Sequence, residues 1–260
     1  EHIVVGAGVQ SLLHILCPMV RDRKNAYFYN PGFRQGRTIF EDFEFRTGGM
    51  RSAREAGGPD SGSICYLTPS QMTVWGEVMH ITERMDLLKE AFEKEILIIE
   101  DDYNSEFRYY NRPTPSLQGL AGGRGVVYLG TFSRLLLPSI RMSFMVLPPE
   151  LLPVYRERSR YYNQTSSKTE QIALCQFIRD GHLESQIRKA RKLYTAKAKK
   201  LCEDIGRIFG DRAVPHLGEA GFLVLAEIRT ELTSEEIARK AAHAGIAVRA
   251  VVPEEGKRGG

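Results

Sequence analysis

Residues 128–144 read YLGTFSRLLLPSIRMSF, and this stretch says most about the fold and the chemistry of the chain. A strand-like run ends in a turn that holds Thr131 and Ser133, and Arg141 follows in the same stretch. Hydroxyl groups combined with a guanidinium are the donors of a phosphate clamp. The basic residue beside them is Arg134, which stays protonated and makes a poor nucleophile. Because the turn follows a strand directly, we expect an anion-binding loop and not an ordinary surface loop.

Short apolar strands alternate with helical patterns on either side of this stretch. Helical patterns follow the first three strands, at 10–20, 34–43 and 81–95. This alternation favours a largely parallel sheet with helices on both faces. Glycine- and proline-rich residues 46–63 and 111–125 are expected to be loops. The expected strands are 2–5, 25–29, 63–67, 96–100, 125–130, 142–147, 221–228 and 246–252.

The pattern changes after about residue 149. Long helices with charged faces extend to residue 209, and a smaller α+β segment follows. The basic residues of the last long helix could contact DNA, but a solvated face is the favoured interpretation. We expect an α/β protein with a large domain at 1–150, connecting helices at 151–209 and part of a small C-terminal domain at 210–260. Because the chain opens directly on a strand, we expect a fragment that lacks the N-terminal part of the large domain.

The composition is that of an ordinary globular protein. The chain has 260 residues, of which 42% are hydrophobic and 26% charged, and a net charge of +4. No apolar run is long enough to span a membrane, and the N-terminus lacks the basic segment of a signal peptide. The four cysteines are scattered without metal-binding spacing, which predicts reduced, buried thiols in a cytoplasmic protein.

Two further stretches carry candidate chemistry. In VVGAGVQSLL (4–13), glycines between a strand and a helix would let backbone N–H groups approach an anion, although a plain tight turn has similar odds. In ILIIEDDYNSEFRY (96–109), three acids stand at the carboxyl end of an apolar strand, where α/β sheets place their ligands. A buried carboxylate needs a positive partner. A protonated ring nitrogen is favoured, and Mg²⁺ is the alternative.

Together, these stretches resemble a known family. The blocks NPGF, LTPS, EDDYNSEFRY, GTFS-x-LLLPSIR and YNQTSSKTEQ occur in one order from Ile3 to about Val252. They resemble the aminotransferase-like domain of the MocR/GabR group of bacterial transcription regulators. Those proteins fuse a winged-helix DNA-binding domain of the GntR type to a domain of the pyridoxal-phosphate (PLP)-dependent transferase fold type I. The resemblance implies PLP as cofactor, a homodimer, DNA bound outside this chain, and an amino compound or PLP itself as effector.

The resemblance also assigns roles to residues. Asp101 would pair with the protonated ring nitrogen, Tyr103 would bond the ring's 3-oxygen, and Phe33 would stack on the ring. The phosphate would be held by the helix start and the clamp, namely Gly8, Val9, Gln10, Thr131, Ser133 and Arg141.

The sequence departs from the family at the central position. Arg134 stands where the family carries the lysine that forms a Schiff base with the cofactor, and Gln71 stands where it carries a histidine. A guanidinium cannot readily form a Schiff base, so PLP is expected to bind non-covalently at best. The favoured function is an effector-sensing, PLP-binding domain. The alternatives are an aminotransferase-like enzyme with an engineered lysine-to-arginine change, and a dimerisation module with a decayed site.

Overall fold

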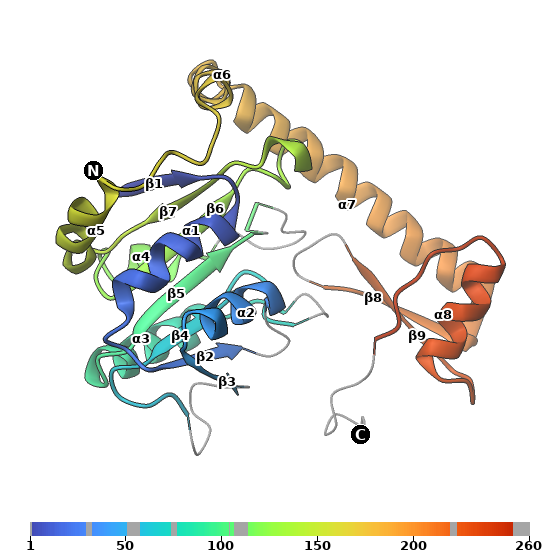
Figure 1. The fold of residues 1–260 in the computed structure, drawn as a ribbon. Coiled ribbons are helices and arrows are strands. Elements are labelled where there is room, and N and C mark those ends of the chain that lie inside the picture. Colours follow the sequence, from blue (N-terminus) through green and yellow to red (C-terminus); the bar gives the residue numbers. More distant parts are fainter. Residues whose placement is uncertain are drawn as a thin grey trace.

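A seven-stranded sheet forms the body of the protein (Figure 1). The computed structural model describes residues 2–29, 33–50, 58–73, 77–103, 105–106, 114–218 and 223–251. The strand order is β1-β7-β6-β5-β4-β2-β3, and β7 runs in the opposite direction to the other six strands. The strands are β1 (Ile3–Gly6), β2 (Asn25–Tyr29), β3 (Arg46–Met50), β4 (Ile64–Leu67), β5 (Leu97–Asp102), β6 (Val126–Thr131) and β7 (Ser143–Val146).

Helices cover both faces of this sheet, as the alternating pattern predicted. Helices α1 (Val9–Leu16) and α2 (Arg34–Asp42) pack on one face, against a core that includes Leu97, Ile99 and Leu129. Helices α3 (Ile81–Glu93) and α4 (Leu117–Leu120) pack on the opposite face, against a core that includes Ile98 and Val126. Successive residues of β5 therefore point alternately to the α1/α2 face and to the α3/α4 face.

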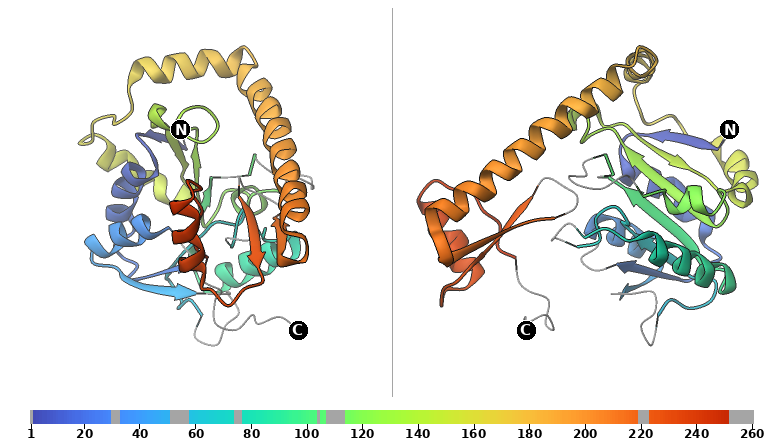
Figure 2. Two further views of the ribbon diagram at one scale, coloured as in Figure 1. Left: turned by 90° about the vertical axis from the view of Figure 1, so that its right-hand side faces the viewer. Right: turned by 180° about the vertical axis from the view of Figure 1, so that it is seen from behind.

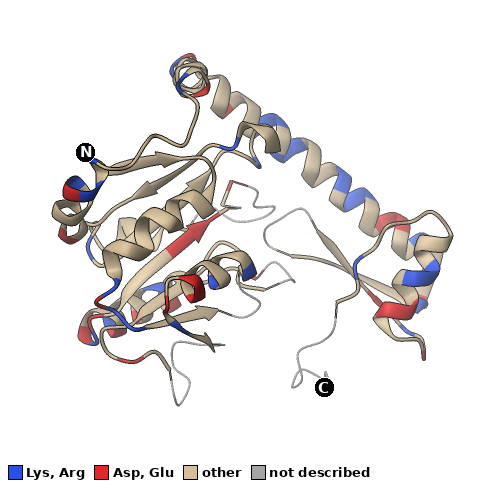
Figure 3. Cartoon of the chain, in the orientation of Figure 1, with Lys and Arg blue, Asp and Glu red and all other residues tan. Residues whose placement is uncertain are grey.

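The rest of the chain leaves the sheet through helices and ends in a smaller α+β part. Helix α7 is 28 residues long and runs from α6 towards a two-stranded antiparallel sheet (Figure 2). Basic residues recur along α7 (Figure 3). The elements are α5 (Leu152–Ser159), α6 (Lys168–Arg179), α7 (His182–Phe209), β8 (Ala213–Leu217), β9 (Val224–Ile228) and α8 (Ser234–His243), with short 3₁₀ helices at Cys17–Val20, Pro138–Ile140, Pro149–Leu151 and Gly210–Arg212.

Four local predictions were wrong. The expected loop at 111–125 contains the short helix α4 (Leu117–Leu120). The expected strand at 246–252 is absent, since residues 246–251 are not in a strand. The glycine-rich stretch expected to be a loop instead begins with β3, which pairs in parallel with β2. Among the cysteines, Cys17 and Cys65 are buried thiols as expected, but Cys175 is exposed and Cys202 half-buried.

Within the described residues, no helix is both long enough and apolar enough to cross a lipid bilayer.

Candidate functional site

The three acids at the end of β5 are divided between the two faces of the sheet. Glu100 and Asp102 share the α3/α4 face with Ile98, and Asp101 shares the α1/α2 face with Ile99. Among the described residues, no group of three or more His, Cys, Asp or Glu side chains is placed to hold a metal ion. The acids therefore do not act as one cluster, and each has its own partners.

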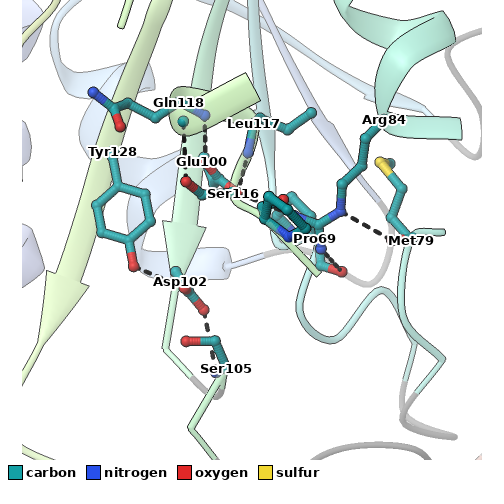
Figure 4. A network of polar contacts seen from close by, with 12 residues as sticks. Pro69, Met79, Arg84, Glu100, Asp102, Ser105, Ser116, Leu117, Gln118 and Tyr128 are labelled. Atoms are coloured by element: carbon teal, nitrogen blue, oxygen red, sulfur yellow. Dashed lines mark hydrogen bonds and ion pairs between the residues drawn. The ribbon is translucent and has the colours of Figure 1, made fainter. Parts of the chain in front are cut away.

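Glu100 belongs to a structural network (Figure 4). Its carboxylate accepts backbone N–H groups of Leu117 and Gln118, each at 3.0 Å, at the start of α4. Arg84, almost fully buried, lies 3.5 Å from the same carboxylate and donates to the carbonyl oxygens of Met79, Pro69 and Pro115. Burial raises the pKa of Glu100, and these donors oppose that rise. The network ties α3, α4 and β5 together.

Asp102 also lies on the α3/α4 face and makes structural contacts there. It accepts the hydroxyl of Tyr128 at 2.7 Å and the backbone N–H of Ser105 at 3.2 Å (Figure 4). The Tyr128 contact links β5 to β6, and the Ser105 contact shapes the turn that follows β5. Asp102 thus has a structural role in the turn beside Asp101.

Asp101 is buried on the other face, with only 6% of its surface exposed. It accepts a hydrogen bond from the Tyr66 hydroxyl on β4, with 2.6 Å between the phenol oxygen and Oδ2. Burial raises the pKa of Asp101 to about 6, while the Tyr66 hydrogen bond and the charge of Arg134 lower it and Asp102 raises it further. A buried carboxylate in this setting is a suitable partner for a cationic group.

Arg134 acts electrostatically on this carboxylate. Its guanidinium carbon lies 4.8 Å from the centre of the Tyr103 ring, a cation–π arrangement. Burial raises the pKa of the Tyr103 phenol, and the positive charge of Arg134 opposes that rise. The structure therefore brings Asp101, Tyr103 and Arg134 close enough to act on one another electrostatically.

The glycine turn and the β6–β7 loop meet at the start of α1. Gly8 is buried and has φ +90° and ψ 163°, a conformation that is essentially restricted to glycine. A Cβ atom built on Gly8 would overlap Nη2 of Arg141, so this guanidinium rests directly against the turn. Arg141 itself adopts a left-handed conformation, with φ +35°. A cation is thereby placed beside the N–H groups of a helix start, and both attract anions.

The hydroxyls of the clamp lie on the same loop. Thr131 Oγ1 accepts a hydrogen bond from the Ser143 hydroxyl at 2.9 Å, across the β6–β7 pair. It accepts a second from the Ser133 backbone N–H at 3.3 Å. The hydroxyl oxygen of Ser133 is buried and has no hydrogen-bond partner among the described residues. A buried hydroxyl without a partner is costly, which suits a site completed by a polar ligand.

The remaining predicted residues lie at the edges of this region. Val9 is half-buried against the core and Gln10 is exposed, so neither side chain lines an enclosed site. Phe33 precedes α2 and lies against the Tyr66 ring, with 6.3 Å between ring centres. Gln71 forms a turn with Thr68, whose hydroxyl donates to the Gln71 carbonyl oxygen at 3.0 Å.

Sequence reasoning missed three neighbours of these groups. Tyr66 lies on β4 and pairs in register with Ile99, and this register places its ring on the Asp101 face. Ser143 is the direct ladder partner of Thr131. Thr165, which accepts the Ala7 backbone N–H at 3.0 Å, is 158 residues away in sequence and gave no local signal.

Comparisons with known proteins show which family the chain belongs to. No protein-family model matches the chain. It is 35% identical over 260 residues to the uncharacterized HTH-type transcriptional regulator YdeL, and 38% identical over 257 residues to YhdI, both from Bacillus subtilis (strain 168). These matches cover 95% and 96% of this chain. The chain is 28% identical to the probable rhizopine catabolism regulatory protein MocR of Rhizobium meliloti over 252 residues, which cover 95% of this chain. The chain is an aminotransferase-like domain of the MocR type.

Solved structures support the fold of this MocR-type domain. The α-aminoadipate aminotransferase LysN of Thermus thermophilus superimposes with a TM-score of 0.77 at 23% identity. That match covers 95% of this chain and 66% of the enzyme. At that identity the likeness shows the fold, which is PLP-dependent transferase fold type I. The MocR-type domain spans about half of the curated relatives it matches, with 55% of YdeL and YhdI and 51% of MocR covered.

Proposed function

We propose that this chain is the effector-sensing domain of a bacterial transcription regulator and that it binds pyridoxal phosphate without a covalent bond. In this proposal the whole protein is a cytoplasmic homodimer. It contacts DNA through a winged-helix domain outside these 260 residues. The effector is an amino compound or PLP itself. The relatives named as transcriptional regulators support this setting.

One observation supports the binding site above all: the Arg141 guanidinium rests against Gly8 at the start of α1. That contact joins the two predicted halves of a phosphate site, which lie more than 130 residues apart in sequence. The buried hydroxyl of Ser133, without a partner among the described residues, adds a donor in the same loop. A phosphate group there would meet backbone N–H groups, hydroxyls and a guanidinium.

The residues beside the clamp fit a pyridine ring. Asp101 would accept the protonated ring nitrogen and Tyr103 would bond the ring's 3-oxygen. PLP contributes a reactive aldehyde conjugated to this ring. At the position where the family carries its lysine, Arg134 keeps a positive charge over Tyr103 but offers no nucleophile. We therefore propose that the site binds PLP reversibly and does not transaminate.

The test is a calorimetric titration of the chain with PLP, repeated in the presence of inorganic phosphate. We expect saturable binding that phosphate weakens by competition. Arg141→Ala should weaken binding, whereas Arg124→Ala, in the turn before β6 at the opposite end of that strand, is the matched control. Absence of saturable binding would favour the decayed-site alternative. A covalent product with amino donors would favour the enzyme.

A further inference from the structure

Tyr66 is placed to control the carboxylate of Asp101. The side chain is 1% exposed on β4, and its ring stacks on Phe28 with 5.1 Å between centres and 24° between planes. Phe33 lies on the ring at 6.3 Å and 28°. Since aromatic neighbours fix the ring, the hydroxyl has little freedom. It donates to Oδ2 of Asp101 at 2.6 Å.

This hydrogen bond leaves the second oxygen of Asp101 for another donor. Within the described residues, the hydrogen bond that Asp101 accepts comes from Tyr66 and ends on Oδ2. Three other groups interact electrostatically with Asp101: Asp102, next on its own strand, Arg134 from the loop after β6, and the Tyr103 phenol. Burial and the neighbouring acid raise the pKa of Tyr66 well above its usual value, so the phenol remains a donor.

We propose that Tyr66 is a positioning residue that holds Oδ2 of Asp101 and thereby aims Oδ1 at the protonated nitrogen of a bound pyridine ring. This inference rests on the proposed function, because the ring is that of pyridoxal phosphate. The phenol also favours the ionised carboxylate, which is the form that pairs with a cationic nitrogen. Tyr66 itself does not touch the ring nitrogen and acts through Asp101.

The test compares Tyr66→Phe with the unchanged chain. This substitution removes one hydroxyl and keeps the stacked ring, so the fold should be retained. Tyr128→Phe is the matched control, because it removes the phenol bonded to Asp102 on the opposite face. Three quantities are measured: the pKa of Asp101 in the ligand-free chain by carboxyl-carbon NMR, the Kd for PLP, and the Kd for an analogue whose ring nitrogen is replaced by carbon.

We expect Tyr66→Phe to raise the pKa of Asp101 and weaken PLP binding about tenfold, the scale of one hydrogen bond to a charged group. The nitrogen-free analogue should bind both proteins equally, and Tyr128→Phe should leave all three quantities near their starting values. An unchanged Asp101 pKa would overturn the inference. Equal weakening for PLP and for the analogue would do the same, since it indicates a merely structural role. If the unchanged chain binds no PLP, the proposed function fails, while the NMR comparison still tests the coupling of Tyr66 to Asp101.

Discussion

Replacing Gly8 with alanine should separate the phosphate clamp from the rest of the site. The added Cβ would overlap Nη2 of Arg141 and lie 3.1 Å from its Cζ, so the guanidinium must shift away from its place against the start of α1. Losing one hydrogen bond to a charged group costs about 1.5–3 kcal/mol, which corresponds to a roughly 10- to 150-fold weaker Kd for PLP. The backbone conformation of Gly8 adds a separate cost to folding of about 1–3 kcal/mol.

Calorimetric titration measures the first effect and urea unfolding the second. Gly122→Ala is the control, because Gly122 also has a positive φ, of 60°, but a Cβ there meets nothing within 4 Å. It should lose some stability without losing affinity for PLP or phosphate. If Gly8→Ala bound PLP as tightly as the unchanged chain does, Arg141 would not be a phosphate ligand, and the clamp assignment would be refuted.

Three further substitutions have defined outcomes. Burial raises the pKa of Glu106 to about 7, so ionisation of this carboxyl opposes folding and stability falls as pH rises from about 4.5 through 7. In urea unfolding, Glu106→Gln should raise the free energy of unfolding by about 1–3 kcal/mol at pH 8 and change it little at pH 4. Parallel pH profiles of the two proteins would contradict this. Arg84→Ala leaves Glu100 buried without its ion-pair partner and should lower the free energy of unfolding in urea by about 3–5 kcal/mol. The control Arg37→Ala removes an exposed ion pair and should lower it by less than about 1 kcal/mol. Equal losses would contradict a structural role for the network. Arg134→Lys should gain a covalent pyridoxyl group after borohydride treatment, seen by intact mass, and failure would mean that the site no longer orients PLP.

Parts of the site that depend on local rules could be predicted from sequence. Strand alternation places Asp101 opposite Glu100, and a strand followed by glycines and a helix predicts the turn at Gly8. The roles of these residues came from the family resemblance and not from spacing. The fold class followed from the alternation of apolar strands and helices.

The parts that depend on long-range packing could not be predicted. The contact between Arg141 and Gly8 joins residues that lie 133 positions apart in the sequence. The hydrogen bond between Tyr66 and Asp101 depends on the β4–β5 register, which the sequence alone does not specify. β3 carries two adjacent glycines, so local propensity argued for a loop, and pairing with β2 overrode it. The apolar run at 246–251 forms no strand and pairs with no strand among the described residues.

The central claim is that this site binds PLP reversibly while Arg134 prevents covalent attachment. Equilibrium dialysis of the chain with PLP tests reversible binding. Exhaustive dialysis against PLP-free buffer, then borohydride treatment and intact-mass measurement of the same sample, test covalent attachment. We expect saturable PLP binding, complete removal of PLP by the second dialysis, and a chain mass unchanged by borohydride. A pyridoxyl group fixed to the chain, or no saturable binding at all, would contradict the claim.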